Sequence, residues 1–232
     1  MSFEFSMVIT TYNRFDTFLD KHVTDYLNNK YISEIVISDD CSSDYEKLMA
    51  KYSSNPKVKI IQQPRNLGAL KNKIVACTHA SKEWICLMDS DNYCGPDYFE
   101  AVIEYWNTHS ADKKLLYSPV KALPLFSFTN FVGVIINNKN LNTSDGALVN
   151  LGNNVFHTSV VQHMVPILSE NIEVYAVDAK YINYTLFKKG ISLVVVPNMT
   201  YNHCVHPGSF YLNTQAKSAQ FDKTFNWTDS DS

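Results

Sequence analysis

The chain has 232 residues, of which 45% are hydrophobic and 19% charged, and its formal net charge at pH 7 is -3. This length allows one sizeable core, as in a single α/β domain. The weak negative charge and the scattered lysines argue against a general nucleic-acid-binding protein, because no basic patch stands out.

The first half of the chain alternates between two patterns. Apolar, β-branched runs predict strands, and apolar residues at helical spacing predict helices. The expected strands are 5–12, 35–38, 58–64 and 84–88, and the expected helices are 17–27, 45–52, 69–79 and 96–106. This alternation predicts a doubly wound α/β fold with a mainly parallel sheet.

The second half is less regular. Strand-like runs occur at 115–123, 131–138, 153–165 and 191–197, and helical spacing covers 173–190. From Asn213 the chain is polar and ends in Asp-Ser-Asp-Ser. We expect this last segment to be a mobile tail.

The five cysteines are odd in number and include no Cys-x-x-Cys pair. This pattern favours reduced thiols over a disulfide framework. No apolar run approaches the roughly 20 residues needed to span a bilayer, and the first residues lack a signal-peptide pattern. We therefore expect a cytoplasmic protein without a transmembrane segment.

Polar clusters follow three of the expected strands. They are residues 10–14 (Thr-Thr-Tyr-Asn-Arg), 39–40 (Asp-Asp) and 89–91 (Asp-Ser-Asp). Ligands of doubly wound sheets bind outside the carboxyl ends of the strands, so we expect the three clusters to meet at one edge. Two carboxylates just past a buried strand repel each other unless a positive charge lies beside them.

Six segments, in this order, resemble the family 2 glycosyltransferases with the GT-A fold. They are VITTYNR (8–14), ISDDCSSD (37–44), RNLGALKN (65–72), ICLMDSDN (85–92), VDAKYINYTLFKKGISLVVVP (177–197) and YNHCVHPGS (201–209). Each segment alone is a weak signal, but six in order are specific. The resemblance spans about residues 5 to 210. It implies a Rossmann-like α/β/α sandwich forming one domain over 1–212, with a nucleotide-binding half (1–106), an acceptor and catalytic half (107–212) and the polar tail (213–232).

Three departures from the family pattern are visible. Lys71 stands where the family more often has Arg, which keeps the charge but loses the two-pronged hydrogen bonding of a guanidinium. Val177 stands where a Glu is common, so one carboxylate remains, that of Asp178. The Gln-x-x-Arg-Trp signature of processive members is absent, which favours transfer of a single sugar.

The resemblance implies inverting transfer from a nucleoside-diphosphate sugar, most of all a UDP-sugar, to a hydroxyl of a glycan or other acceptor. Asp178 would be the general base. Mn²⁺ or Mg²⁺ would neutralise the leaving diphosphate, with Asp91 as its main ligand and Asp89, His203 and His206 as further candidates. The residues expected to bind the nucleotide sugar are Thr10, Tyr12, Arg14, Asp39, Asp40, Asn66, Gly68, Lys71, Asn72, Asp89, Ser90, Gly152, Asn153 and Asn154.

Structural roles are the alternative for several of these residues. Asp178 could simply complement a helix dipole, Lys71 could be a solvated surface residue, and the acidic and serine residues at 39–44 could cap the next helix. An NAD-dependent oxidoreductase would need a Gly-x-Gly-x-x-Gly after the first strand, which the chain lacks. A haloacid-dehalogenase-like phosphatase would need an Asp on that strand, and a sugar nucleotidyltransferase a glycine-rich phosphate loop. A non-catalytic module that binds nucleotide sugar or glycan remains an alternative.

Overall fold

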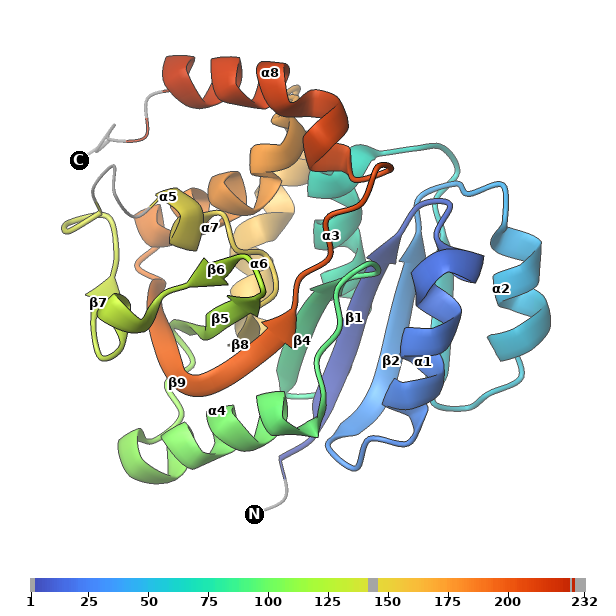
Figure 1. Cartoon of the computed structure of the whole chain (residues 1–232), viewed down its shortest axis with the longest axis horizontal. Coiled ribbons are helices and arrows are strands. Elements are labelled where there is room, and N and C mark those ends of the chain that lie inside the picture. Colours follow the sequence, from blue (N-terminus) through green and yellow to red (C-terminus); the bar gives the residue numbers. More distant parts are fainter. Residues whose placement is uncertain (1–2, 142–145, 226, 228–232) are drawn as a thin grey trace.

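The computed structural model of the chain describes residues 3–141, 146–225 and 227 (Figure 1). The strands are β1 (Phe5–Thr11), β2 (Ile32–Asp39), β3 (Val58–Gln62), β4 (Trp84–Asp89), β5 (Leu115–Leu123), β6 (Phe126–Ser127), β7 (Ile135–Ile136), β8 (Val155–His157) and β9 (Ser192–Asn202). The α-helices are α1 (Asp20–Leu27), α2 (Tyr45–Tyr52), α3 (Gly68–Thr78), α4 (Pro96–His109), α5 (Gly146–Val149), α6 (Val161–Met164), α7 (Asp178–Lys188) and α8 (Phe210–Thr224).

Within these described residues the strands form one sheet in the order β3-β2-β1-β4-β8-β5-β9-β7, and β6 pairs with β5. β1 pairs in parallel with β2 and β4, and β2 pairs in parallel with β3. All seven residues of β1 are buried, as expected for a strand covered on both faces. β8 is antiparallel to its neighbours β4 and β5, whereas β5 and β9 are parallel.

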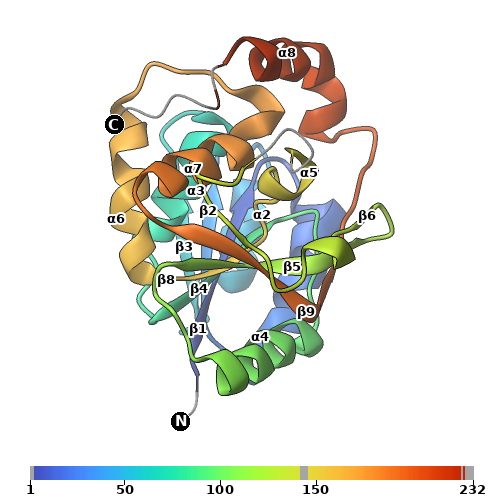
Figure 2. The ribbon, with the colours of Figure 1, turned by 90° about the vertical axis from the view of Figure 1, so that its left-hand side faces the viewer.

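Helices cover both faces of this sheet. The two views in Figures 1 and 2 show α3, α6 and α7 on one face and α1 and α4 on the other. The predicted α/β/α sandwich with a mainly parallel sheet is thereby confirmed. No helix in the described part of the chain is both long enough and apolar enough to cross a bilayer.

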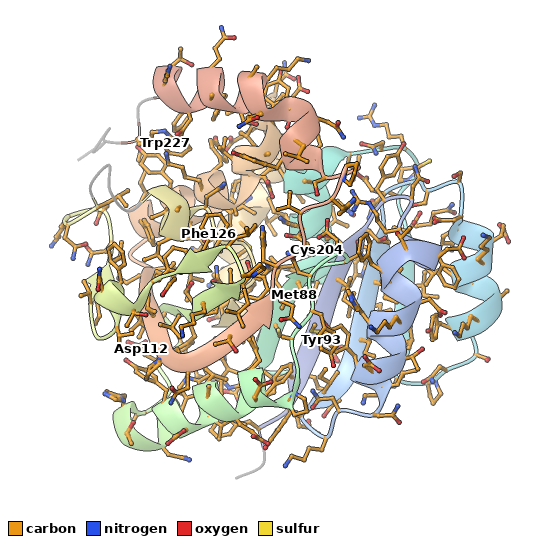
Figure 3. The ribbon with its side chains drawn as sticks, in the orientation of Figure 1. Met88, Tyr93, Asp112, Phe126, Cys204 and Trp227 are labelled. Carbon is orange, nitrogen blue, oxygen red and sulfur yellow. The ribbon has the colours of Figure 1, made fainter. Side chains whose placement is uncertain are left out.

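The parallel register brings the ends of the central strands together. Thr10 lies opposite Ser38 on one side and Asp89 on the other, and Thr11 lies opposite Asp39. Met88, just before the end of β4, is fully buried and lies near the middle of the molecule in Figure 3. The polar side chains that follow β1, β2 and β4 are therefore held at one edge by a rigid, buried core.

Aromatic side chains close the opposite end of the sheet. The rings of Trp84 and Trp106 lie 4.2 Å apart, those of Phe5 and Phe99 5.0 Å apart, and Tyr117 meets Trp106 edge-on at 5.3 Å. Such pairs add stability beyond the area that they bury. This end therefore anchors the scaffold, and the other end carries the polar residues.

Two of the strands expected in the second half differ from the prediction. The expected strand at 153–165 is a strand only over β8 and then turns helical at Thr158–Val160 and α6. The expected strand at 131–138 is reduced to the two residues of β7. Four of the 13 residues in the first of these segments are valines, and their β propensity is overridden there by burial among α3 and α7.

The expected polar tail is also different from the prediction. Its first part belongs to α8, which begins at Phe210 and ends at Thr224. Ser218 is the buried residue of this helix, so its sequence carries no apolar stripe that would have predicted it. The rest of the expected tail, residues 226 and 228–232, lies outside the described residues.

Candidate active site

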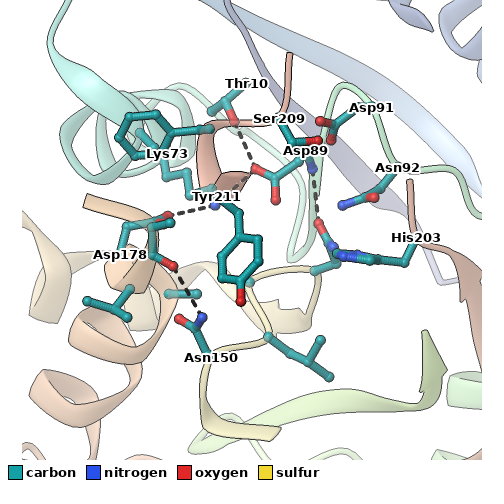
Figure 4. Close-up of a pocket in the computed structure, with 18 of the residues that line it drawn as sticks. Thr10, Lys73, Asp89, Asp91, Asn92, Asn150, Asp178, His203, Ser209 and Tyr211 are labelled. Atoms are coloured by element: carbon teal, nitrogen blue, oxygen red, sulfur yellow. Dashed lines mark hydrogen bonds and ion pairs between the residues drawn. The ribbon is translucent and has the colours of Figure 1, made fainter. Parts of the chain in front are cut away.

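A pocket of about 890 Å³ opens at the carboxyl ends of β1 and β4. This volume lies within the range of small-molecule and cofactor sites. Side chains from α3, α5, α7 and α8 surround it, together with the turn between β5 and β6 and the loop after β9. Figure 4 shows Asp89, Lys73 and Asp178 facing one another across the pocket.

Most of the residues predicted from sequence line this pocket. They are Thr10, Tyr12, Arg14, Asp40, Asn66, Gly68, Asn72, Asp89, Ser90, Asp91, Gly152, Asn153, Asp178 and His203. The predicted residues outside its lining are Asp39, Lys71, Asn154 and His206. Of these four, His206 still contacts Arg14 and Asp91, which line the pocket.

Lys71 points away from the pocket. Its ammonium donates hydrogen bonds to the carbonyls of Leu168 and Glu170, at 3.1 and 2.8 Å. Lys73, two residues further along α3, enters the pocket instead. Two helical residues span about 200°, so the two lysines lie on nearly opposite sides of α3. The basic residue contributed by this helix is therefore Lys73, which sequence reasoning missed.

Lys73 is 5% exposed and forms two ion pairs. Its Nζ lies 2.7 Å from Oδ2 of Asp178 and 2.9 Å from Oδ1 of Asp89. Burial lowers the pKa of the Lys73 ammonium, but the charges of Asp178 and Asp89 raise it by more, so the pKa lies above its ordinary value. Lys73 is therefore a permanent positive charge between the two carboxylates.

Arg14 is the positive partner of the second aspartate. Its Nη1 lies 3.1 Å from Oδ2 of Asp91 and also contacts Nε2 of His206, while its Nη2 donates to the carbonyl of Gly208 at 2.7 Å. The same Asp91 oxygen lies 3.3 Å from His206 Nε2. One guanidinium thus joins the end of β1, the Asp-Ser-Asp segment and the loop before α8.

The two carboxylates at the end of β2 accept hydrogen bonds from backbone N–H groups. Asp40 accepts hydrogen bonds from the N–H groups of Leu67 and Gly68, at 2.7 and 3.0 Å, and so fixes the start of α3. Burial raises the pKa of the Asp40 carboxyl, and these two donors offset part of that effect. Asp39 is buried outside the pocket and accepts from the N–H of Ser42 at 2.9 Å. Asp39 therefore fixes this local turn, whereas no side-chain hydrogen bond among the described residues caps the start of α2, so the helix-capping alternative for residues 39–44 is wrong.

The turn before β8 holds the end of β4. Oδ1 of Asn153 accepts from the N–H of Asp89 at 3.0 Å, and the carbonyl of Asn154 accepts from the N–H of Leu87 at 3.0 Å. Asn154 acts here through its backbone and lies outside the pocket. The turn thus fixes the backbone of Asp89 at the end of β4.

His203 lies among aromatic groups. Its Nδ1 is 3.1 Å from the hydroxyl of Tyr201, and the ring of Phe126 meets it edge-on at 5.6 Å. Burial lowers the pKa of His203, so the neutral imidazole is favoured. The described residues contain no group of three or more His, Cys, Asp or Glu side chains arranged to hold a metal ion on their own.

Helix α8 contributes a wall that sequence reasoning missed. Its pocket-lining residues are Phe210, Tyr211, Gln215, Ser218, Ala219 and Asp222. The helix is attached to the start of α7 by Ser218, whose hydroxyl accepts from the N–H of Ala176 at 3.1 Å, and by the ion pair of Lys180 with Asp222. These polar attachments depend on tertiary structure, so no local sequence pattern signals them.

The chain resembles known proteins in sequence. Residues 6–113 match the sequence model of glycosyl transferase family 2. The chain is 29% identical over 122 residues to the poly(ribitol-phosphate) beta-N-acetylglucosaminyltransferase TarS of Staphylococcus aureus (strain Mu50 / ATCC 700699), covering 49% of this chain and 20% of TarS. It is 28% identical over 99 residues to the succinoglycan biosynthesis protein ExoO of Rhizobium meliloti (strain 1021), covering 43% of this chain and 28% of ExoO. The chain spans less than two thirds of the length of either relative.

Solved structures share the fold. Residues 1–349 of S. aureus TarS in complex with UDP-GlcNAc superpose with a TM-score of 0.67 at 16% identity, covering 89% of this chain and 60% of that one. The mannosyltransferase PcManGT from Pyrobaculum calidifontis, in complex with GDP-Man and Mn²⁺, gives 0.67 at 15% identity, covering 96% and 65%. Over residues 6–113 this chain therefore resembles glycosyl transferase family 2, and its fold is GT-A.

Proposed function

We propose that the chain is an inverting glycosyltransferase that moves one sugar from a UDP-sugar to a hydroxyl acceptor, with Asp178 as the general base. The observation that carries the proposal is the shared contact of Asp178 and Asp89 with Lys73 inside one pocket. A carboxylate suited to take a proton thus lies beside the acidic segment expected to bind the donor. The UDP-GlcNAc bound to the structurally similar TarS supports a uridine nucleotide.

The donor side of the pocket is the edge formed by β1, β4 and α3. Tyr12 is 48% exposed at the pocket, and its ring could stack on the base. Asn66 and Gly68 lie beside Asp40 at the start of α3 and line the same pocket. Gly68 has a φ of +80°, which favours glycine at this turn.

Divalent metal binding fits the donor set around Asp91. A carboxylate oxygen and an imidazole nitrogen, those of Asp91 and His206, lie 3.3 Å apart, and both are groups that bind Mn²⁺. Such sites often complete their coordination with phosphate oxygens and water, so two protein ligands suffice. A bound Mn²⁺ or Mg²⁺ would neutralise charge on the diphosphate. Arg14, which contacts both side chains, would have to shift toward the phosphates.

Charge in the pocket supports the need for a cation. The described residues that line it include five carboxylates (Asp40, Asp89, Asp91, Asp178 and Asp222) and two basic side chains, Arg14 and Lys73. Both basic groups are already paired with carboxylates. A diphosphate entering this acidic space needs additional positive charge.

The acceptor side lies near Asp178 at the start of α7. In an inverting transfer, Asp178 takes the proton of the acceptor hydroxyl while its oxygen attacks the anomeric carbon and the diphosphate leaves from the other face. Exposed apolar side chains, among them Phe126, Phe210 and Tyr211, line the pocket. TarS is named for a phosphate polymer, but the acidic pocket here favours an uncharged hydroxyl acceptor such as a glycan.

Calorimetry tests the donor site. UDP, GDP and dTDP are titrated into the protein with and without Mn²⁺, and we expect metal-dependent binding of UDP. Asp91→Ala should remove the metal dependence, whereas Asp97→Ala, an exposed control on α4, should keep it. Unchanged Mn²⁺ dependence in Asp91→Ala would refute the metal role.

Turnover tests the base. A panel of UDP-sugars is screened for UDP release with water or simple glycans as acceptors. Asp178→Asn should lower the rate about 10²- to 10⁴-fold and leave UDP affinity nearly unchanged. A wild-type protein that binds nucleotide sugar without any turnover would instead be the non-catalytic binding module.

A further inference from the structure

Lys73 connects two parts of the pocket that come from different elements. Asp89 ends β4 on the donor side, and Asp178 begins α7 on the acceptor side. Both carboxylates contact the same ammonium, at 2.9 and 2.7 Å (Figure 4). A displacement of Lys73 would therefore change its ion pairs with both carboxylates.

The backbone around the ammonium leaves room for it. A Cβ at Gly152 would lie 3.3 Å from Lys73 Nζ and 3.3 Å from the Cβ of Ala179. Asn153, the next residue, holds the N–H of Asp89. The turn at 152–153 thus accommodates Lys73 and fixes one of its two partners.

The other basic side chain that lines the pocket cannot take over the two ion pairs of Lys73. Among the described residues that line the pocket, Arg14 is the other basic side chain, and it pairs with Asp91. Without Lys73, two carboxylates would face each other in a mostly buried space and repel. The orientation of the Asp178 carboxylate therefore depends on Lys73.

The bond to Lys73 uses one oxygen of Asp178. Oδ2 accepts from the ammonium, and no hydrogen bond between described side chains engages Oδ1. Asp178 lines the pocket. One carboxylate oxygen is thus anchored, and the other is available for a hydroxyl proton.

We propose that Lys73 is a positioning residue, which anchors Asp178 through Oδ2 and couples its position to Asp89 on the donor side. This inference rests on the proposed role of Asp178 as base. In the transfer, the acceptor O–H bond breaks with its proton going to Oδ1. The acceptor oxygen bonds to the anomeric carbon, and the diphosphate leaves with the electron pair of the broken C–O bond. Lys73 keeps its proton throughout and touches neither substrate.

A double-mutant cycle on turnover tests the inference. UDP release is measured for the wild type, Lys73→Met, Asp178→Asn and the double variant, with UDP affinity measured alongside. Lys73→Met should lower kcat about a hundredfold, the typical cost of misplacing a reacting group by 1 Å. Because Lys73 acts through Asp178, the double variant should be no slower than Asp178→Asn alone.

Lys57→Met is the control variant for this cycle. Lys57→Met removes a lysine whose ammonium binds the carbonyls of Tyr26 and Leu27, outside the pocket, and should keep wild-type turnover. Wild-type kcat in Lys73→Met, or effects that multiply in the double variant, would overturn the positioning role while leaving the base intact. Wild-type turnover in Asp178→Asn would overturn the base and the inference together. If Lys73→Met does not fold, the double variant, which lacks the unpaired Asp178 charge, is compared with Asp178→Asn by the same criterion.

Discussion

Replacing Lys73 by Met should destabilise the protein strongly. At 2.7 Å and an effective dielectric constant of about 20, the attraction between Lys73 and Asp178 is about 6 kcal/mol before desolvation is subtracted. Removing one partner of a buried pair costs about 3–5 kcal/mol, because the other charge stays buried and unpaired. The Asp89 side chain is 32% exposed, so water can solvate it. We therefore expect the low end, a loss of about 3 kcal/mol.

This loss is measurable by urea unfolding followed through tryptophan fluorescence. Trp84 and Trp106 lie in the aromatic cluster and report on the core. For a chain of this length each kcal/mol lowers Tm by about 2–4 °C, so Lys73→Met should melt about 6–12 °C below the wild type.

Two further variants separate charge from packing. Lys71→Met, on the same helix, loses hydrogen bonds to two carbonyls and should cost about 1 kcal/mol. Adding Asp178→Asn to Lys73→Met removes the unpaired charge and should recover at least half of the loss. The reasoning is refuted if Lys73→Met costs less than about 1 kcal/mol, or if the double variant is no more stable than the single one.

Three other predictions concern separate parts of the molecule. Burial lowers the pKa of His22 below 6.5, so the unfolded chain binds a proton before the folded chain does as the pH falls. The free energy of unfolding should therefore decrease from pH 6.5 down to the folded pKa. His22→Gln should flatten that slope in urea titrations at several pH values. Gly190 has a φ of +77°, so Gly190→Ala should cost about 1–2 kcal/mol in the same assay. Phe126→Ala should raise the KM for a glycan acceptor about 3- to 10-fold without changing UDP affinity, and an unchanged KM would remove Phe126 from the acceptor site.

The first half of the fold was predictable because its signals are local. The strand 5–12 and the helix 45–52 differ from β1 and α2 by at most one residue, since the local apolar pattern of each segment agrees with its burial. The polar clusters at the strand ends were also predictable, because parallel strands deliver their carboxyl ends to one edge. Asp178 was found only through its resemblance to a family motif.

Parts of the second half could not be predicted from local pattern. At 153–165 four valines favour a strand, yet only three residues pair with β4, Val155 to His157. The remainder packs as short helices, where contacts with other helices decide the structure. Helix α8 is attached through polar groups such as Ser218 and Asp222. Its role as a pocket wall therefore cannot be predicted from hydrophobic periodicity.

The carboxylates Asp89 and Asp91 show where prediction from sequence ends. Their position after a buried strand already requires positive charge nearby, and this requirement can be read from a few residues. The side chains that supply it come from elsewhere: Arg14 follows the neighbouring strand β1, and Lys73 comes from α3. Arg14 was predictable because β1 and β4 are adjacent and parallel. Lys73 was not, because the choice between it and Lys71 depends on the rotation of α3 against α7, which only the packed structure defines.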